Sequence, residues 1–140
     1  MPDALTVHAE YEGKDSTRIY FNNGDSEDIT LTPLGEDLYM LEESSFLGEA
    51  MYKDVIRATR REDGNLLFVS IERPSGLVTQ SWLLSQDIID SSDFGSILER
   101  IMEVGGHWER AFGGILLVHT PDGRMQEITD RIKALTKPRT

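Results

Sequence analysis

The 140-residue chain contains no cysteine, no long apolar run and little positive charge. Without cysteine it forms no disulfide, binds no metal through thiolates and uses no cysteine nucleophile. No stretch approaches the roughly 20 apolar residues that a membrane helix needs, and the first residues lack the basic and apolar regions of a secretory signal. These absences fit the reducing cytoplasm, where we expect this protein to act, and they predict no membrane partner.

The net charge is −11, and most of it comes from the first part of the chain. Residues 1–50 have 12 acidic and 2 basic side chains, whereas residues 51–100 have 8 and 6, and residues 101–140 have 5 and 6. The phosphate backbone of a nucleic acid attracts the opposite charge, so a nucleic-acid-binding function is disfavoured. A protein with a basic surface would be attracted to such a chain, although a negative surface also serves solubility alone.

The first 84 residues contain seven short runs that are typical of β-strands, because apolar and polar side chains alternate along most of them. The expected strands are 5–11, 18–22, 29–31, 38–41, 53–61, 66–72 and 77–84. Asp63-Gly64 predicts a hairpin between the fifth and sixth of them. Pro33 has no N–H for a strand pair, so we expect it to end the third strand or to place that strand at a sheet edge.

After residue 90 the apolar period changes to that of a helix. Phe94, Ile97 and Ile101 lie on one face of a predicted helix that ends at Gly105-Gly106. Strands at 107–112 and 115–118 follow, and a second helix is expected from Pro121. Together with the strand at 77–84, this order is β-α-β-β-α, which is most of a ferredoxin-like unit.

The predicted fold class is therefore α+β. We expect an N-terminal antiparallel β meander or small barrel, residues 1–76, packed against a C-terminal split β-α-β-β-α (ferredoxin-like) unit, residues 77–140. No linker or internal repeat separates the two halves, so the prediction is one compact structural unit.

The three histidines show no close metal-ligand spacing. His8 falls on the polar side of the first expected strand. His107 and His119 flank the Gly113-Gly114 turn and approach each other, near Trp108, if the two strands pair. A zinc site needs more ligands than these, and two ordinary strand-end histidines are the simpler interpretation. We predict no metal and no cofactor.

No phosphate-binding, dinucleotide-binding or nucleophile-elbow motif occurs in the chain. Acidic residues are abundant, but neighbouring carboxylates on turns do not face each other across a cleft, as paired acid–base catalysts must. The sequence therefore names no catalytic residue and leaves enzyme activity uncertain.

The connection 43–52 joins two expected strands and carries four large apolar side chains without a strand pattern. A long connection in a compact domain is either functional or a misread element. An apolar loop tip beside acidic turns suits a protein interface, although these side chains can equally plug one end of the barrel. The predicted partner-binding residues are Asp25, Glu27, Asp28, Glu36, Asp37, Glu42, Glu43, Phe46 and Tyr52.

Four motifs stand in a recognisable order: Leu34-Gly35-Glu36-Asp37-Leu38-Tyr39, Asp54-Val55-Ile56-Arg57-Ala58, the run from Asp63 to Val69, and Pro74-Ser75-Gly76. Over about residues 29–135 the chain resembles the bacterial family called domain of unknown function 4265. That family usually has glycine where this chain has Lys53, and often His-Ser-Thr where this chain has Leu77-Val78-Thr79. The family has no established activity, so the resemblance implies a bacterial cytosolic protein with this order of elements and supplies no function.

Three functions stay open at this point. The first is a non-catalytic acidic protein-binding module, above all an immunity protein that neutralises a basic toxin, because an acidic surface can occupy the phosphate-binding site of a nuclease. The second is a small-molecule-binding protein or an enzyme with a cleft between the two halves. The third is a homo-oligomeric structural domain joined through sheet edges or through the apolar loop.

Overall fold

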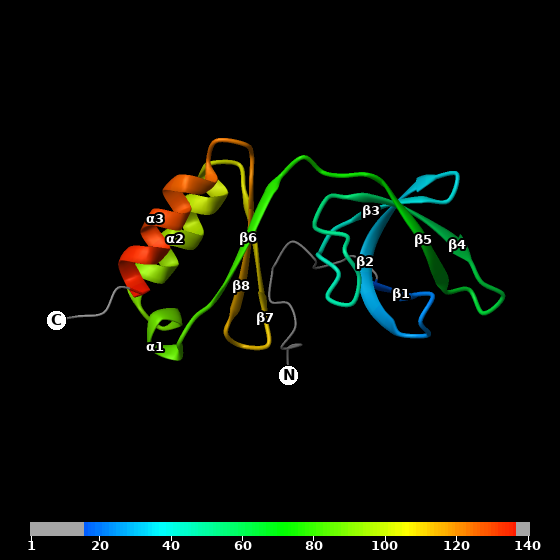
Figure 1. Ribbon diagram of the computed structural model, residues 1–140, viewed down its shortest axis with the longest axis horizontal. Helices are drawn as coiled ribbons and strands as arrows, with labels where there is room; N and C mark the ends of the chain where they lie inside the picture. Colours follow the sequence, from blue (N-terminus) through cyan, green and yellow to red (C-terminus); the bar gives the residue numbers. More distant parts are fainter. Residues whose placement is uncertain (1–15, 137–140) are drawn as a thin grey trace. The chain divides into compact units, whose positions relative to one another are not determined.

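The computed structural model describes residues 16–136, which form two compact units, residues 16–75 and residues 76–136 (Figure 1). The predicted α+β class is confirmed, with five strands in the first unit and three strands with three helices in the second. The strand expected at 5–11, and His8 within it, lie outside the described residues. That the two halves pack as one structural unit stays a prediction.

The first unit is a closed five-stranded barrel, and the predicted small barrel is thereby confirmed. Its strands are β1 Ser16–Tyr20, β2 Ser26–Gly35, β3 Leu38–Leu41, β4 Val55–Arg60 and β5 Leu66–Arg73. Consecutive strands pair antiparallel, and a short parallel pairing of β1 with β5 closes the ring. Alternate side chains point inward and form an aliphatic core that includes Ile19, Ile29, Leu31, Leu41, Ile56 and Leu66.

Pro33 does not end its strand, which corrects the first of the two expectations for this residue. β2 continues past Pro33, which pairs with Tyr39, and the register shifts between Pro33 and Gly35. A proline next to an irregularity fits the rule that proline within a sheet lies at an edge or at a bulge. The β4–β5 hairpin forms as predicted, because Gly64 adopts a φ of 88° that its turn requires.

The second unit follows the predicted β-α-β-β-α order, with one short helix that the sequence did not reveal. Its elements are β6 Val78–Leu83, α1 Gln86–Ile89, α2 Ser92–Glu103, β7 His107–Ala111, β8 Ile115–Thr120 and α3 Met125–Thr136. The sheet is antiparallel in the order β6-β8-β7. Helices α2 and α3 cover one face of it, and their apolar stripes pack on Leu116 and Val118 (Figure 1).

Helix α3 begins at Met125, four residues later than predicted. Pro121 instead opens a turn in which the N–H of Arg124 donates to the Pro121 carbonyl. Gly123 has a φ of 85°, and a right-handed helix cannot continue through that conformation.

Candidate functional site

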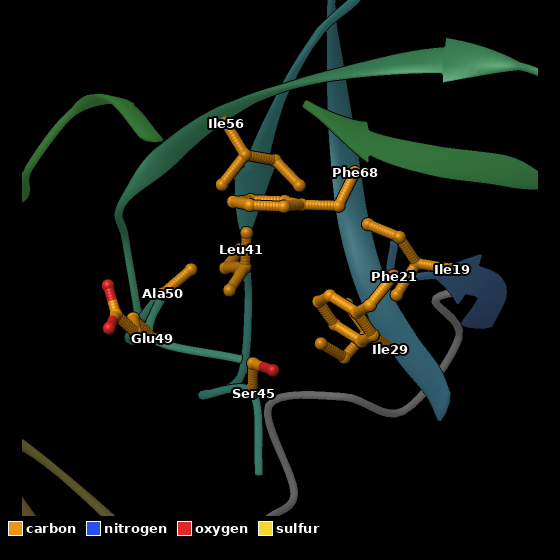
Figure 2. Close-up of a pocket in the computed structure, with 9 residues that line it drawn as sticks. All are labelled: Ile19, Phe21, Ile29, Leu41, Ser45, Glu49, Ala50, Ile56 and Phe68. Carbon is orange, nitrogen blue, oxygen red and sulfur yellow. The ribbon is translucent and has the colours of Figure 1, made fainter. Parts of the chain in front are cut away.

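The connection between β3 and β4, residues 42–54, is an ordered loop without helix or strand. Ser45, Glu49 and Ala50 of this loop border the barrel interior together with Phe21 and other core side chains (Figure 2). Ala50 is buried in the aliphatic core. The loop therefore covers part of the barrel core. Because it forms no helix or strand, its backbone N–H groups need hydrogen-bond acceptors from side chains.

Glu27, at the start of β2, accepts most of the hydrogen bonds that fix the loop tip. Its carboxylate accepts hydrogen bonds from the Ser45 hydroxyl, from the N–H of Phe46 at 3.0 Å and from the N–H of Leu47 at 3.3 Å. The Ser45 oxygen in turn accepts from the N–H of Gly48 at 2.8 Å. One carboxylate thus fixes four consecutive residues, in the way that a capping side chain satisfies the backbone of a helix end.

Three further carboxylates fix the base of the loop. Buried Glu42 accepts from the Thr32 hydroxyl and from the Lys53 ammonium at 2.9 Å. Glu43 accepts from the N–H of Thr30 at 2.7 Å. Buried Asp54 accepts from two backbone N–H groups, at 2.9 Å from Met51 and at 2.7 Å from Ser75. The loop is therefore held by internal charge-assisted hydrogen bonds at both its ends and its tip.

The tip lies beside the turn between β1 and β2. A Cβ atom on Gly48 would come within 2.8 Å of the Phe21 ring, so only glycine allows this close approach. The N–H of Phe21 donates to the Asp25 carbonyl at 2.9 Å, which closes the neighbouring turn. The close approach of Gly48 to Phe21 places Leu47, which is 53% exposed, at the same end of the barrel as Asp25.

We call this surface the loop end of the barrel and define it by its solvent-facing residues. They are Asp25, Asp28, Leu47 and Glu49, which are exposed, and Phe46, which is partly buried. Asp28 also forms an ion pair with Arg18 at 3.1 Å.

The nine predicted partner-binding residues separate into three groups. Glu27, Glu42, Glu43 and Tyr52 lie within the barrel unit as partly or fully buried side chains, and the three carboxylates serve the loop. Asp25, Asp28 and Phe46 belong to the loop end. Glu36 and Asp37 are exposed in the β2–β3 turn, at the far end of β2.

The acidic turns therefore do not meet on one face. β2 is 10 residues long and separates Asp28, near its start, from Glu36, just after its end. At about 3.3 Å per residue, the path along the strand from Asp28 to Glu36 is about 26 Å. Glu36 and Asp37 have φ values of 56° and 65°, and the tight turn that they form is reason enough for polar residues there.

The barrel interior contains a small apolar cavity next to the loop (Figure 2). The space that it offers to a water molecule is about 10 Å³, whereas sites for small ligands usually have volumes of about 300–1,000 Å³. This cavity is a packing defect of the core that holds at most about one water.

The second unit has a row of polar side chains on the sheet face opposite the helices. Thr79 of β6, His119 of β8 and His107 of β7 stand opposite one another in register. Thr79 Oγ1 lies 2.7 Å from His119 Nδ1, and His119 Nε2 lies 2.6 Å from Glu109 Oε2. His119 and Glu109 are fully buried, and the two imidazole rings stack at 6.2 Å, as expected if the strands pair.

Which atoms donate in this row depends on the tautomer of His119. With Glu109 ionised and His119 neutral, Nε2 donates to Glu109 and Nδ1 accepts from the Thr79 hydroxyl. The order hydroxyl, imidazole, carboxylate is also that of a nucleophile, a base and an orienting acid. Here the base and the acid are both 0% exposed, so the row stabilises strand pairing rather than presenting a reactive group to solvent.

Sequence reasoning found the pair His107 and His119 but missed Thr79 and Glu109. The available signal for Glu109 was its position two residues after His107 in a strand, which places both on one face. Thr79 is 40 residues from His119, and no local pattern connects them.

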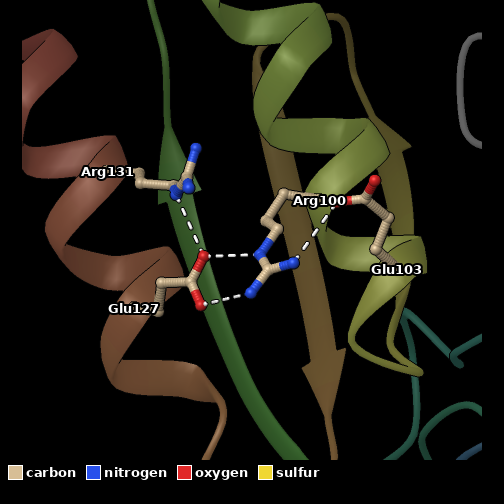
Figure 3. A network of polar contacts seen from close by, with 4 residues as sticks. All are labelled: Arg100, Glu103, Glu127 and Arg131. Atoms are coloured by element: carbon tan, nitrogen blue, oxygen red, sulfur yellow. Dashed lines mark hydrogen bonds and ion pairs between the residues drawn. The ribbon is translucent and has the colours of Figure 1, made fainter.

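A charge network joins α2 to α3 (Figure 3). Arg100 binds Glu127 through two hydrogen bonds, at 2.7 and 3.1 Å, and Arg131 reaches the same carboxylate at 3.1 Å. The Arg100 guanidinium lowers the pKa of Glu127, and Glu127 raises the pKa of Arg100. On the barrel, Arg57 lowers the pKa of Glu72 in the same way. Both networks tie neighbouring elements together at the surface.

Residues 16–136 contain no group of three histidine or acidic side chains placed to hold a metal ion. Within the same residues, no helix has the length and apolar character that crossing a membrane requires.

Comparisons with known proteins give the fold alone. No protein-family model and no curated protein matches the chain. A solved structure that matches is described as a novel crystal structure of a hypothetical protein from Neisseria gonorrhoeae. It shares 16% sequence identity with this chain at a TM-score of 0.55, and the match covers 88% of this chain and 89% of that one.

Proposed function

We propose that this chain is a non-catalytic protein-binding module of the cytoplasm, and that it binds its partner through the loop end of the barrel. The observation that supports this most is Leu47, a large apolar side chain that stands 53% exposed on a loop whose backbone is fixed from within. A fixed loop loses little conformational freedom on binding, so less of the interaction energy is lost in ordering it.

The chemistry of this surface indicates the kind of partner. An apolar anchor surrounded by charge is typical of an interface with a dry centre and a polar rim. The exposed residues Asp25, Asp28 and Glu49 at this end of the barrel would supply an acidic rim. We therefore infer a protein partner with an apolar pocket and a basic rim, and an immunity protein that neutralises a basic toxin is the role that fits best.

A site-specific photo-crosslinker tests where the partner binds. The crosslinking amino acid replaces Leu47 in one variant and Leu34 in the other, and each variant is irradiated in the cells that produce the protein. Leu34 is a matched control because it is 46% exposed on the same barrel but lies near the opposite end of β2. We expect one defined adduct from position 47 and none from position 34. Equal adducts from both positions, or none from either, would contradict the proposed surface.

A charge-reversal pair tests the basic rim, using the crosslinked protein as the purified partner. Asp25→Lys with Asp28→Lys changes the charge by the same amount as Glu36→Lys with Asp37→Lys, at the other end of β2. We expect the first variant to bind at least about tenfold more weakly and the second to bind within about twofold of the unchanged protein. The difference should shrink at high salt, since exposed charges are screened. Equal effects of the two variants would show that the partner is attracted by the overall charge and not by the loop end.

A further inference from the structure

The three-stranded sheet of the second unit has an accessible edge at β6. Within residues 16–136, β6 pairs on one side with β8 and has no strand on its other side. In an antiparallel strand, every second residue directs its N–H and C=O groups to such an edge. Gln80 and Ser81 are exposed, and Leu83 is 82% exposed, so nothing described in this chain covers the edge.

This edge lacks the features by which proteins usually prevent strands from pairing. Natural edge strands contain lysine, proline or a bulge that blocks a second strand. β6 reads Val-Thr-Gln-Ser-Trp-Leu, without a charge or a proline, and it keeps an unbroken register with β8 over six residue pairs. The barrel strands leave no free edge, because the five strands form a closed ring. β6 is therefore built as an edge that can accept another strand.

We propose that β6 pairs with β6 of a second copy of this chain, antiparallel about a two-fold axis at Ser81. This pairing places Leu83 opposite Thr79 of the other copy, on the same face of the sheet, because residues equally distant from the axis face each other. Neither strand brings a charged side chain that would repel the other copy at this contact. A two-fold contact uses the same patch on both chains and stops at a dimer.

The charge of the chain sets the conditions under which this dimer forms. Each copy has a net charge of −11, so long-range repulsion opposes association. Salt screens this repulsion but leaves backbone hydrogen bonds and apolar contacts in place. Six-residue strands give a small interface, so the dimer depends on protein concentration and strengthens as salt is added.

A single introduced cysteine tests the proposed axis, and the natural absence of cysteine makes the test clean. Residues directly opposite each other in antiparallel strands have Cα atoms about 4.5–5.5 Å apart, which is within the range that a disulfide spans. Under mild oxidation in high salt, we expect Ser81→Cys to form a covalent dimer at least about tenfold faster than Val69→Cys. Val69 is 50% exposed on β5, a strand of the closed barrel. Equal rates would overturn the proposed pairing.

Sedimentation of the full chain provides the second measurement. Over about a hundredfold range of concentration in high salt, we expect a shift from monomer to dimer that weakens in low salt. Leu83→Lys should abolish the shift, because it adds a charge to the edge, whereas Val69→Lys makes the same change on the barrel and should leave it. A monomer under all conditions, or a dimer that survives Leu83→Lys, would reject the β6 contact. Neither result bears on the loop end of the barrel.

Discussion

The hydrogen bonds from the loop tip to Glu27 lead to a prediction that can be tested without knowing the proposed binding partner. Replacing Glu27 with glutamine keeps the shape of the side chain but removes its charge and one of its two acceptor oxygens. The Ser45 hydroxyl and the N–H of Leu47 both donate to the same oxygen, Oε2, whereas the N–H of Phe46 donates to Oε1. The glutamine oxygen can still accept from one side, so part of the network fails and part remains.

The size of the effect follows from these contacts. A hydrogen bond to a charged group contributes about 1.5–3 kcal/mol, and the loss here is partial, so we expect the loop tip to become less stable by about 2 kcal/mol. If the loop opens locally, exchange of the Phe46 and Leu47 amide hydrogens should become about thirtyfold faster. Unfolding in urea should show a smaller loss, because opening of the loop leaves the barrel strands paired.

Amide hydrogen exchange followed by NMR measures this directly. Asp28→Asn is the matched control: it removes one carboxylate charge from the next residue of β2, where the carboxylate only meets Arg18 at the surface. Such an exposed pair contributes about 0–1 kcal/mol, so the loop amides should exchange as before. If Glu27→Gln leaves the exchange of the Phe46 and Leu47 amides unchanged, the loop is held by its packing, and the argument from a carboxylate-fixed tip is wrong.

Two further predictions concern the second unit. Thr79→Val removes the hydroxyl that donates to the buried His119 imidazole and should lower the free energy of unfolding in urea by about 1–2 kcal/mol, whereas Ser81→Ala, two residues along the same strand face, should change it by less than about 0.5 kcal/mol. Arg100 lowers the pKa of Glu127 below its ordinary value of 4.5, so the stability that this carboxylate contributes is complete above that value and is lost as the pH falls through the lower, folded-state pKa. Glu127→Gln should therefore lose less stability than the unchanged protein between about pH 5 and about pH 3, and equal losses in acid titrations of the two proteins would show that the pair contributes nothing.

Local patterns in the sequence predicted those parts of the fold that depend on neighbouring residues. Alternation and the Asp63-Gly64 turn identified the β4–β5 hairpin, and helical spacing identified α2. The pairing that closes the barrel was not predictable in this way. It joins Ile19 to Leu66 in parallel, and no turn or period within either strand refers to the other. The start of α3 was misplaced because proline opens both helices and turns, and only the conformation of Gly123 decides between them.

The candidate site was harder to predict than the fold. Glu27 and Asp28 are adjacent acids in the sequence, yet the first turns to backbone groups up to 20 residues away and the second meets solvent. Alternation along β2 does say that their side chains point to opposite faces. It does not say which face the loop covers, because that depends on the path of residues 42–54. The sequence thus singled out this segment but did not reveal that several of its carboxylates bind the loop.

The internal use of these carboxylates changes what the net charge implies about function. Glu27, Glu42, Glu43 and Asp54 all accept hydrogen bonds from within the barrel unit, so part of the surplus negative charge stabilises a loop instead of forming a surface. The predicted partner-binding acids that remain exposed are divided between the two ends of β2. Charge alone therefore selects no binding face. In the proposed function the loop end is selected for its exposed leucine on a fixed backbone, and we expect its exposed acids to add orientation and speed of encounter rather than the bulk of the affinity.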